Sequence, residues 1–121
     1  MILYATGWKR SIRMKQYRIE ITDLAAEDLE NAGDYIAYQL MNPLAAVNTV
    51  EGIRKQINSL GDFPERNELD EDEKLAELGI RNDYYKNYKI YYVVKNDVIY
   101  VVRILHMRVD SRMWLYRTFG L

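Results

Sequence analysis

Apolar and polar residues alternate over a short segment near the start of the chain. Tyr17, Ile19 and Ile21 are separated by charged residues, and this two-residue period is typical of a strand with one buried face. The pattern predicts a first strand over residues 14–21.

The apolar period then changes to three and four residues, which predicts two helices with one buried face each. The first stripe consists of Ala25, Leu29, Ala32, Ile36 and Leu40, and the second of Ala46, Val50, Ile53, Ile57 and Leu60. Thr22 or Asp23 can cap the first helix, Asn42-Pro43 can begin the second, and Gly61 can end it. Because about three residues join the helices, we expect an antiparallel helical hairpin.

Three β segments follow the predicted helices. Residues 79–84 begin a strand region, and the runs 88–94 and 98–104 are apolar at nearly every position. Such runs are typical of the central strands of a sheet covered by helices. Asn96 and Asp97 both tolerate positive φ, so they can form the two-residue turn of a hairpin.

Together these elements predict an α+β fold with the order β-α-α-β-β-β. The N-terminal strand precedes the helical hairpin, which packs on a mainly antiparallel four-stranded sheet. We expect residues 65–78 to form a solvated acidic loop and part of residues 106–121 to form a short helix. At 121 residues the chain is long enough for one domain.

Composition narrows the possible chemistry. The chain has no cysteine and one histidine, which excludes disulfides and metal sites built from several cysteines or histidines. We therefore expect no metal and no cofactor. No apolar run approaches the roughly 20 residues of a membrane-spanning helix, and the N-terminus lacks the apolar stretch of a secretion signal. The expected location is the cytoplasm.

The net charge of −1 conceals an uneven distribution of charge. Residues 1–13 carry three basic and no acidic side chains, and residues 14–64 carry four basic and eight acidic ones. Residues 65–78 carry two basic and seven acidic side chains, whereas residues 79–121 carry eight basic and three acidic ones. Local charge decides where a polyanion can dock, so the C-terminal strands are where a nucleic acid could bind.

Eight short segments of the sequence, taken together in their order and spacing along the chain, resemble the RelE/ParE superfamily of toxins. They are YRIEI at 17–21, LAAEDL at 24–29, YI at 35–36, PLAA at 43–46, FPE at 63–65, GIR at 79–81, YKIYYVV at 88–94 and VRILHMRVD at 102–110. The resemblance implies the toxin of a type II toxin–antitoxin module, which inhibits growth and is neutralised by a cognate antitoxin.

The resemblance begins near Met14, which makes residues 14–121 a single toxin domain. Residues 1–13 are then an N-terminal extension or the product of a misassigned start. Alternatively, they form an ordered arm that packs Tyr4 and Trp8 on the domain.

Superfamily members that cleave messenger RNA in the ribosome do so without a metal, using acid–base groups and cations that stabilise the charged phosphate. The catalytic candidates here are Arg81, Lys89, Arg103, His106 and Arg108, and the candidates for target or RNA binding are Lys86, Arg112 and Trp114. Convergence of the catalytic candidates requires a bend or bulge near Leu105. The alternative is that the arginines pair with acidic side chains or with the antitoxin, and that the histidine is a hydrogen-bonded surface residue.

Two departures weaken the nuclease interpretation. Trp114 stands where the nucleases often place a catalytic tyrosine, and indole cannot shuttle a proton at neutral pH. The slightly acidic chain also differs from ribosome-directed toxins, which tend to be strongly basic. We therefore prefer a ParE-like poison of DNA gyrase. A RelE-like mRNA endonuclease, or a degenerate non-toxic member that only binds its antitoxin, remains the alternative.

Each of these functions implies an antitoxin that folds over the toxin in a hetero-oligomer. Apolar residues left on the outside of the predicted helices are candidates for that contact, namely Tyr35, Tyr38 and Val47. The tyrosines around the C-terminal strands are explained by their preference for a half-buried sheet.

Overall fold

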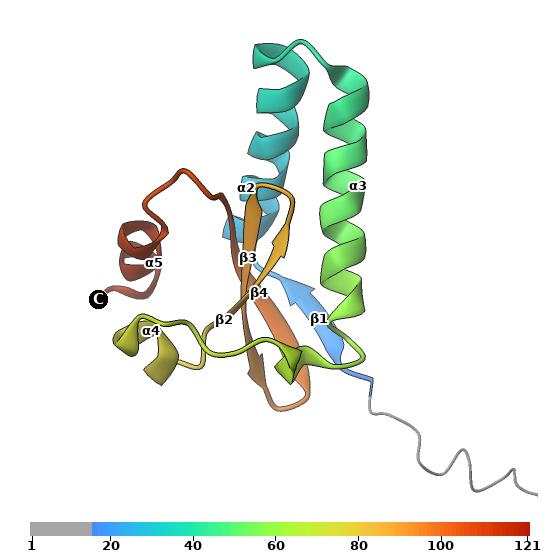
Figure 1. Cartoon of the computed structure of the whole chain (residues 1–121). Helices are drawn as coiled ribbons and strands as arrows, with labels where there is room; N and C mark the ends of the chain where they lie inside the picture. The colour runs from blue at the N-terminus through green and yellow to red at the C-terminus, as the bar shows by residue number, and fades with distance from the viewer. Residues whose placement is uncertain (1–15) are drawn as a thin grey trace, which may run out of the picture.

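The computed structural model describes residues 16–121, so the predictions for residues 1–13 lie outside the described part. Its elements are β1 (Arg18–Ile21), α2 (Asp23–Asp34), the π-helical turn η1 (Tyr35–Gln39), α3 (Pro43–Ser59), the 3₁₀ turn η2 (Pro64–Arg66), α4 (Glu73–Glu77), β2 (Arg81–Tyr85), β3 (Tyr88–Lys95), β4 (Val98–His106) and α5 (Ser111–Phe119). The strands form one sheet in the order β1-β4-β3-β2 (Figure 1). Only the β1–β4 pairing is parallel, so the predicted α+β fold with its mainly antiparallel sheet is confirmed.

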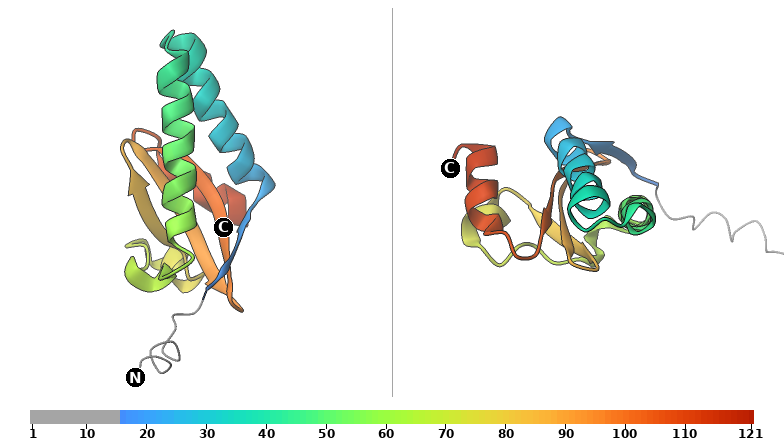
Figure 2. Two further views of the ribbon diagram at one scale, coloured as in Figure 1. Left: turned by 90° about the vertical axis from the view of Figure 1, so that its right-hand side faces the viewer. Right: turned by 90° about the horizontal axis from the view of Figure 1, so that it is seen from above.

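The helical hairpin begins and turns at the predicted residues. Thr22 caps α2 by accepting a hydrogen bond from the Ala25 amide at 3.2 Å, and Asn42 caps α3 by accepting one from the Ala45 amide at 3.0 Å. Pro43 occupies the first turn of α3, where the absence of an N–H costs nothing. The two helices lie side by side on one face of the sheet (Figure 2).

The prediction that Leu40 belongs to the buried stripe of the first helix is wrong. Leu40 is 57% exposed, whereas Ala25, Leu29, Ala32 and Ile36 are buried as expected. The cause is the π-helical turn, in which the Leu40 amide donates to the carbonyl of Tyr35, five residues back. A wider turn rotates the following side chains out of register with the stripe.

Two apolar cores lie on opposite faces of the sheet. The first joins the hairpin to the sheet through Ala25, Leu29, Ala32, Ile53, Ile57, Leu60, Tyr88, Ile90, Tyr92, Ile99, Val101 and Ile104. The second joins α4 and α5 to the other face through Leu75, Ile80, Tyr91, Val102, Leu105 and Leu115. The central strands β3 and β4 therefore contribute to both cores, which explains their nearly continuous apolar sequence.

The expectation of a solvated loop over residues 65–78 is wrong for part of that segment. It contains η2 and α4, and Leu75 is only 1% exposed. Asp72 caps α4 by accepting from the Leu75 amide at 3.1 Å. The reason is that Leu75 is needed to fill the second core, while the neighbouring carboxylates remain at the surface.

The predicted turn between β3 and β4 is confirmed. Asn96 has φ 51° and Asp97 has φ 69°, the left-handed values that a tight two-residue hairpin requires. The predicted short helix in the C-terminal segment is α5.

A buried ion pair fastens α2 to β4 at the point where β1 has ended. The Asp28 carboxylate accepts from Arg103 Nε at 2.7 Å, from Arg103 Nη2 at 2.8 Å and from the Ile104 amide at 2.9 Å. Both side chains are 9% exposed. Arg103 Nη1 also donates to Thr118 of α5 at 3.1 Å. The hydrogen bonds to Asp28 raise the pKa of Arg103 above its usual value, so the guanidinium keeps its charge.

Gly52 is required for close contact between α3 and β2, because a Cβ at this position would overlap the ring of Tyr85. Replacing glycine by alanine inside a helix normally stabilises it by about 1 kcal/mol. We expect Gly52→Ala instead to destabilise the fold by about 1–3 kcal/mol in urea unfolding, the usual cost of overpacking. In a Tyr85→Leu background the same substitution should be neutral or stabilising. An equal loss in both backgrounds would contradict the overlap.

The ion pair can be tested by a double-mutant cycle with Asp28→Asn and Arg103→Met. Each single change leaves one buried group without its charged partner, so we expect a loss of about 3–5 kcal/mol in the free energy of unfolding. The double variant should lose clearly less than the sum of the two. The exposed pair Arg18–Glu20, at 3.3 Å, is the control, and Arg18→Met should cost at most about 1 kcal/mol. Additive losses for Asp28 and Arg103 would show that the pair is not coupled.

Candidate functional site

The five catalytic candidates are distributed over two ends and two faces of the sheet. Arg81 pairs with Tyr92 and His106 pairs with Tyr88. These two β3 residues are four positions apart, which corresponds to about 13 Å along a strand. The irregularity in β4 pairing lies between Tyr91 and Tyr92, so the bend near Leu105 that convergence requires is absent from this pairing.

Arg81 lies at the start of β2, and its side chain is held by a hydrogen bond. We call this end of the sheet, beside η2, the closed end. Arg81 Nη1 donates to the carbonyl of Asn67 at 2.5 Å, which fixes the segment that follows η2. Tyr92 donates to the carbonyl of Pro64 in the same region at 2.5 Å, and burial raises the pKa of this tyrosine. The arginine thus helps to hold a loop through a backbone carbonyl, whereas the structural alternative expected an acidic side chain as its partner.

Asp83 adds a polar cluster at the edge of β2. It accepts from Gln56 of α3 at 2.9 Å and from Arg66 at 3.1 Å. Burial alone would raise the pKa of Asp83, but these donors and the Tyr84 amide lower it below its usual value. The cluster therefore contains an ionised carboxylate with donors from three elements.

Arg103 is enclosed between α2 and α5 by the ion pair described above. Its guanidinium lies 5.4 Å from the ring of Trp114, and that of Arg117 lies 5.9 Å from the same ring. Trp114 is 42% exposed. The indole thus stacks on cations while one part of it remains accessible to a partner.

His106, Arg108 and Lys86 lie at the opposite end of the sheet, which we call the basic end. The Met107 amide donates to the carbonyl of Asn87 at 2.8 Å and brings the β2–β3 turn beside the end of β4. His106 packs edge-on against Tyr88 with ring centroids 5.2 Å apart. Its Nδ1 accepts from the Arg108 amide at 3.1 Å, which leaves Nε2 to carry the proton of the neutral ring.

A small cavity of about 360 Å³ opens beside the basic end. It lies between α2 and the ends of β3 and β4, and its lining includes Asn31, Tyr35, Tyr88, His106 and Arg108. Tyr35 is 53% exposed. The hairpin therefore reaches the basic end through this tyrosine.

Lys89 faces away from the hairpin, on the side of the sheet covered by α4 and α5. Its Nζ lies 5.1 Å from the ring centre of Tyr91 and 5.4 Å from that of Tyr84. Burial alone would lower the pKa of Lys89, but the two tyrosine hydroxyls raise it above its usual value. The ammonium group therefore stays protonated at neutral pH and cannot act as a base.

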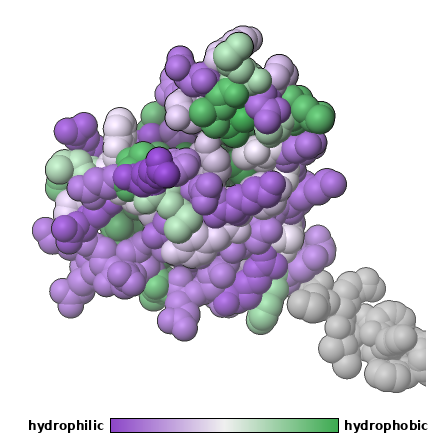
Figure 3. All heavy atoms as spheres, turned by 45° about the horizontal axis from the view of Figure 1, so that its top comes forward, coloured by the Kyte–Doolittle hydropathy of each residue, from purple (hydrophilic) through white to green (hydrophobic). Residues whose placement is uncertain are grey.

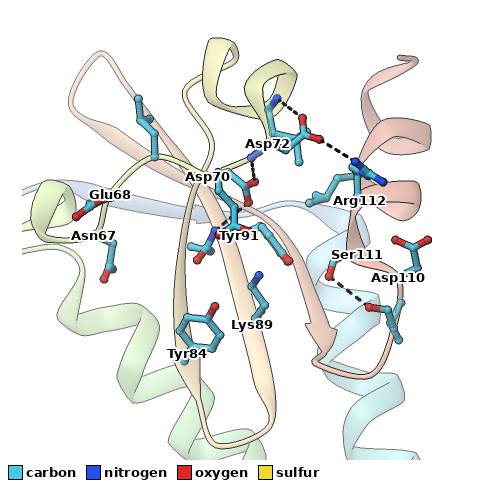
Figure 4. A pocket seen from close by; sticks show the side chains of 16 residues that line it. Asn67, Glu68, Asp70, Asp72, Tyr84, Lys89, Tyr91, Asp110, Ser111 and Arg112 are labelled. Atoms are coloured by element: carbon cyan, nitrogen blue, oxygen red, sulfur yellow. Dashed lines mark hydrogen bonds and ion pairs between the residues drawn. The ribbon is translucent and has the colours of Figure 1, made fainter.

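A larger cavity of about 760 Å³ surrounds Lys89 (Figure 4). It lies between residues 67–72, strands β2 and β3, and the start of α5. Its charged lining consists of Glu68, Asp70, Glu71, Asp72 and Asp110 on the acidic side, and Lys89 and Arg112 on the basic side. Carboxylates thus outnumber cations in this cavity. Such a lining repels a polyanion.

Two of these carboxylates are already used by hydrogen bonds. Asp70 accepts from Asn82 at 2.9 Å. Asp72 accepts from Tyr116 at 3.0 and 2.9 Å, and Arg112 lies 3.8 Å from it. Burial alone would raise the pKa of Asp72, but the Leu75 amide and the Tyr116 hydroxyl lower it. Asp72 therefore accepts hydrogen bonds as an anion and is unsuited to donate a proton.

Sequence reasoning overlooked Asp28, which decides what Arg103 can do. A signal was present, because Asp28 stands three residues after Ala25 and four before Ala32, on the side of the buried stripe. An acid in that position needs a buried donor. The pairing of Lys89 with Tyr84 and Tyr91 follows from strand alternation and could also have been found.

The three predicted antitoxin contacts are exposed on the hairpin. Tyr35, Tyr38 and Val47 are 53%, 76% and 59% exposed, respectively. Val47 lines a groove between α2 and α3, whereas Tyr35 lines the small cavity. Their role stays a prediction.

Within residues 16–121 no group of three or more potential metal-ligating side chains comes together. Over the same residues, none of the helices combines the length and apolar character needed to cross a bilayer.

Comparison with known proteins places this architecture in one family. The sequence profile described as "ParE toxin of type II toxin-antitoxin system, parDE" matches residues 19–110. A solved chromosomal ParDE toxin–antitoxin system from P. aeruginosa contains a similar chain, with a TM-score of 0.65 and 22% identity over 75% of this chain and 96% of that one. A chain of the RelBE2 toxin–antitoxin complex from Mycobacterium tuberculosis is similar with a TM-score of 0.53 and 18% identity, over 78% of this chain and 94% of that one.

No curated protein sequence matches significantly. The two solved structures share the fold, and the profile covers most of the domain. The chain belongs to the family of ParE toxins of type II toxin–antitoxin systems.

Proposed function

We propose that this toxin poisons DNA gyrase by binding, as the resemblance to ParE-type members implies, and does not cleave messenger RNA. The observation that carries the proposal is the separation of the cationic side chains. Arg81 holds a loop at one end, Arg103 is enclosed by Asp28, and Lys89 faces the acidic cavity. A metal-free ribonuclease needs an acid, a base and cations around one phosphate.

The electrostatics support the same proposal. An RNA strand in the large cavity would meet five carboxylates and two cations. The ammonium of Lys89 is protonated, and Asp72 is held as an anion by its donors. Neither group is suited to take the proton of a ribose hydroxyl and return it to a leaving oxygen.

The proposed target contact is the basic end. Lys86 and Arg108 are exposed there. Arg112, at the start of α5, lies on the rim of the acidic cavity with its side chain 70% exposed and offers a separate cation. Cations at a protruding end can reach the phosphates of enzyme-bound DNA without requiring a concave active site. Trp114 of α5, which is 42% exposed, offers an additional aromatic contact.

The proposed partner is an antitoxin that covers the hairpin at Tyr35, Tyr38 and Val47. Both similar solved structures are toxin–antitoxin assemblies. Tyr35 lines one cavity with His106 and Arg108. A segment folded over Tyr35 would therefore also cover the basic end, which gives neutralisation a direct steric cause.

Controlled expression of the chain should arrest growth with DNA breaks and an SOS response, and mRNA should remain uncut within codons. The double variant Lys86→Glu/Arg108→Glu reverses two charges at the basic end and should lower toxicity about tenfold or more, because it removes electrostatic attraction to the target. Growth, an SOS reporter and mapping of mRNA ends measure these outcomes at matched protein levels.

The matched control is Lys55→Glu/Lys95→Glu, which makes the same change in net charge on α3 and at the end of β3 remote from the basic end. It should retain toxicity. Codon-specific mRNA cleavage without DNA damage would replace gyrase by the ribosome as the target. Equal loss of toxicity in both double variants would remove the basic end from the target contact.

A further inference from the structure

The turn of the helical hairpin is unusually apolar for this chain. Residues 35–50 contain no charged side chain, although 29% of the whole sequence is charged. Six large apolar side chains in this segment are 53–83% exposed: Tyr35, Tyr38, Leu40, Met41, Leu44 and Val47. We call these six residues the hairpin tip. Figure 3 looks towards this end of the molecule and shows hydrophobic side chains gathered there.

The backbone holds the hairpin tip in one conformation. The Leu40 amide donates to the Tyr35 carbonyl at 3.2 Å, and the Asn42 amide donates to the Ile36 carbonyl at 3.1 Å. Met41 adopts φ 51° between these bonds and is 83% exposed. A left-handed methionine is unfavourable compared with glycine. The chain thus keeps a large apolar side chain where a glycine would relieve the strain, which is a feature of functional surfaces.

We propose that the hairpin tip binds a second copy of this chain, so that the free toxin forms a two-fold symmetric dimer through the ends of its hairpins. The exposed fractions of the six residues amount to about four fully exposed large side chains, or about 600–800 Å² at 150–200 Å² each. A standard interface buries about 800 Å² on each partner. Burial of the whole hairpin tip would therefore give an interface in the lower part of the standard size range.

The absence of charge favours a copy of the same surface as the occupant. In a two-fold interface each patch meets its own counterpart, so any charged group near the axis would face a like charge. The hairpin tip contains none. Because the backbone is already ordered, association costs little conformational entropy beyond that of the side chains.

This inference concerns the toxin alone and stands apart from its target. It touches the proposed function at Tyr35, Tyr38 and Val47, which are the proposed antitoxin contacts. Where both proposals hold, the antitoxin and the second toxin copy compete for these residues.

Sedimentation of the purified full chain from 1 to 100 µM tests the dimer. The expected mass of the wild type is twice the 14.4 kDa of one chain. The variant Met41→Glu/Leu44→Glu should sediment as a monomer with unchanged circular dichroism, since both side chains are largely exposed. The matched control Met107→Glu/Met113→Glu changes two exposed methionines elsewhere, at 51% and 52% exposure, and should remain a dimer. A monomeric wild type at 100 µM, or dissociation of the control as well, would overturn the proposal.

Cross-linking tests the geometry, because the chain has no cysteine of its own. A single Gln39→Cys change beside the two-fold axis should give an oxidised, covalent dimer at low concentration. Asn58→Cys, exposed near the far end of α3, should give much less. Equal cross-linking of both variants contradicts a dimer through the hairpin tip. A monomeric wild type whose binding to antitoxin is lost in Met41→Glu/Leu44→Glu assigns the hairpin tip to the antitoxin and likewise overturns the proposal.

Discussion

The contact between Asp28 and the edge of β4 holds the architecture together. Strand β1 ends at Ile21, and β4 continues for five more residues without a strand on that side. Helix α2 takes over, since Thr22 donates to the Val102 carbonyl at 3.3 Å and Asp28 accepts from the Ile104 amide and from Arg103. Arg103 then reaches Thr118 of α5. One carboxylate thus links the hairpin, the sheet and the C-terminal helix.

This linkage limits the chemistry available to the toxin. A guanidinium that is bonded on two sides to a buried carboxylate cannot leave to bind a phosphate without exposing an unpaired charge in the interior. Arg103, in the second half of β4, is therefore held in a structural contact in this conformation. The exposed cations lie elsewhere: Lys86 and Arg108 at the basic end, and Arg112 at the start of α5.

Local patterns predicted the elements, whereas tertiary contacts decided the exceptions. The caps Thr22 and Asn42 and the turn Asn96-Asp97 act through hydrogen bonds and φ preferences within a few residues, so the sequence was sufficient. The burial of Leu75 depends on a second core made by distant strands and α5. The exposure of Leu40 depends on a π-helical turn, which the apolar period does not encode. Of the catalytic candidates, His106 and Arg108 line one cavity. Arg103 and Lys89 do not join them, because neighbouring residues of a strand point to opposite faces of the sheet.

The two ends of the sheet have opposite characters, and this asymmetry explains where partners can act. At one end Tyr92, Pro64, Asn67 and Arg81 form a closed set of hydrogen bonds. At the other end Lys86 lies 5.6 Å from the ring centre of Tyr85, and the hairpin contributes Tyr35 to the cavity that Arg108 lines. A partner that bound at the closed end would have to break these internal hydrogen bonds, which would lower the stability of the fold. The antitoxin, target and second-copy contacts proposed above therefore all fall at or beside the end that the hairpin overhangs.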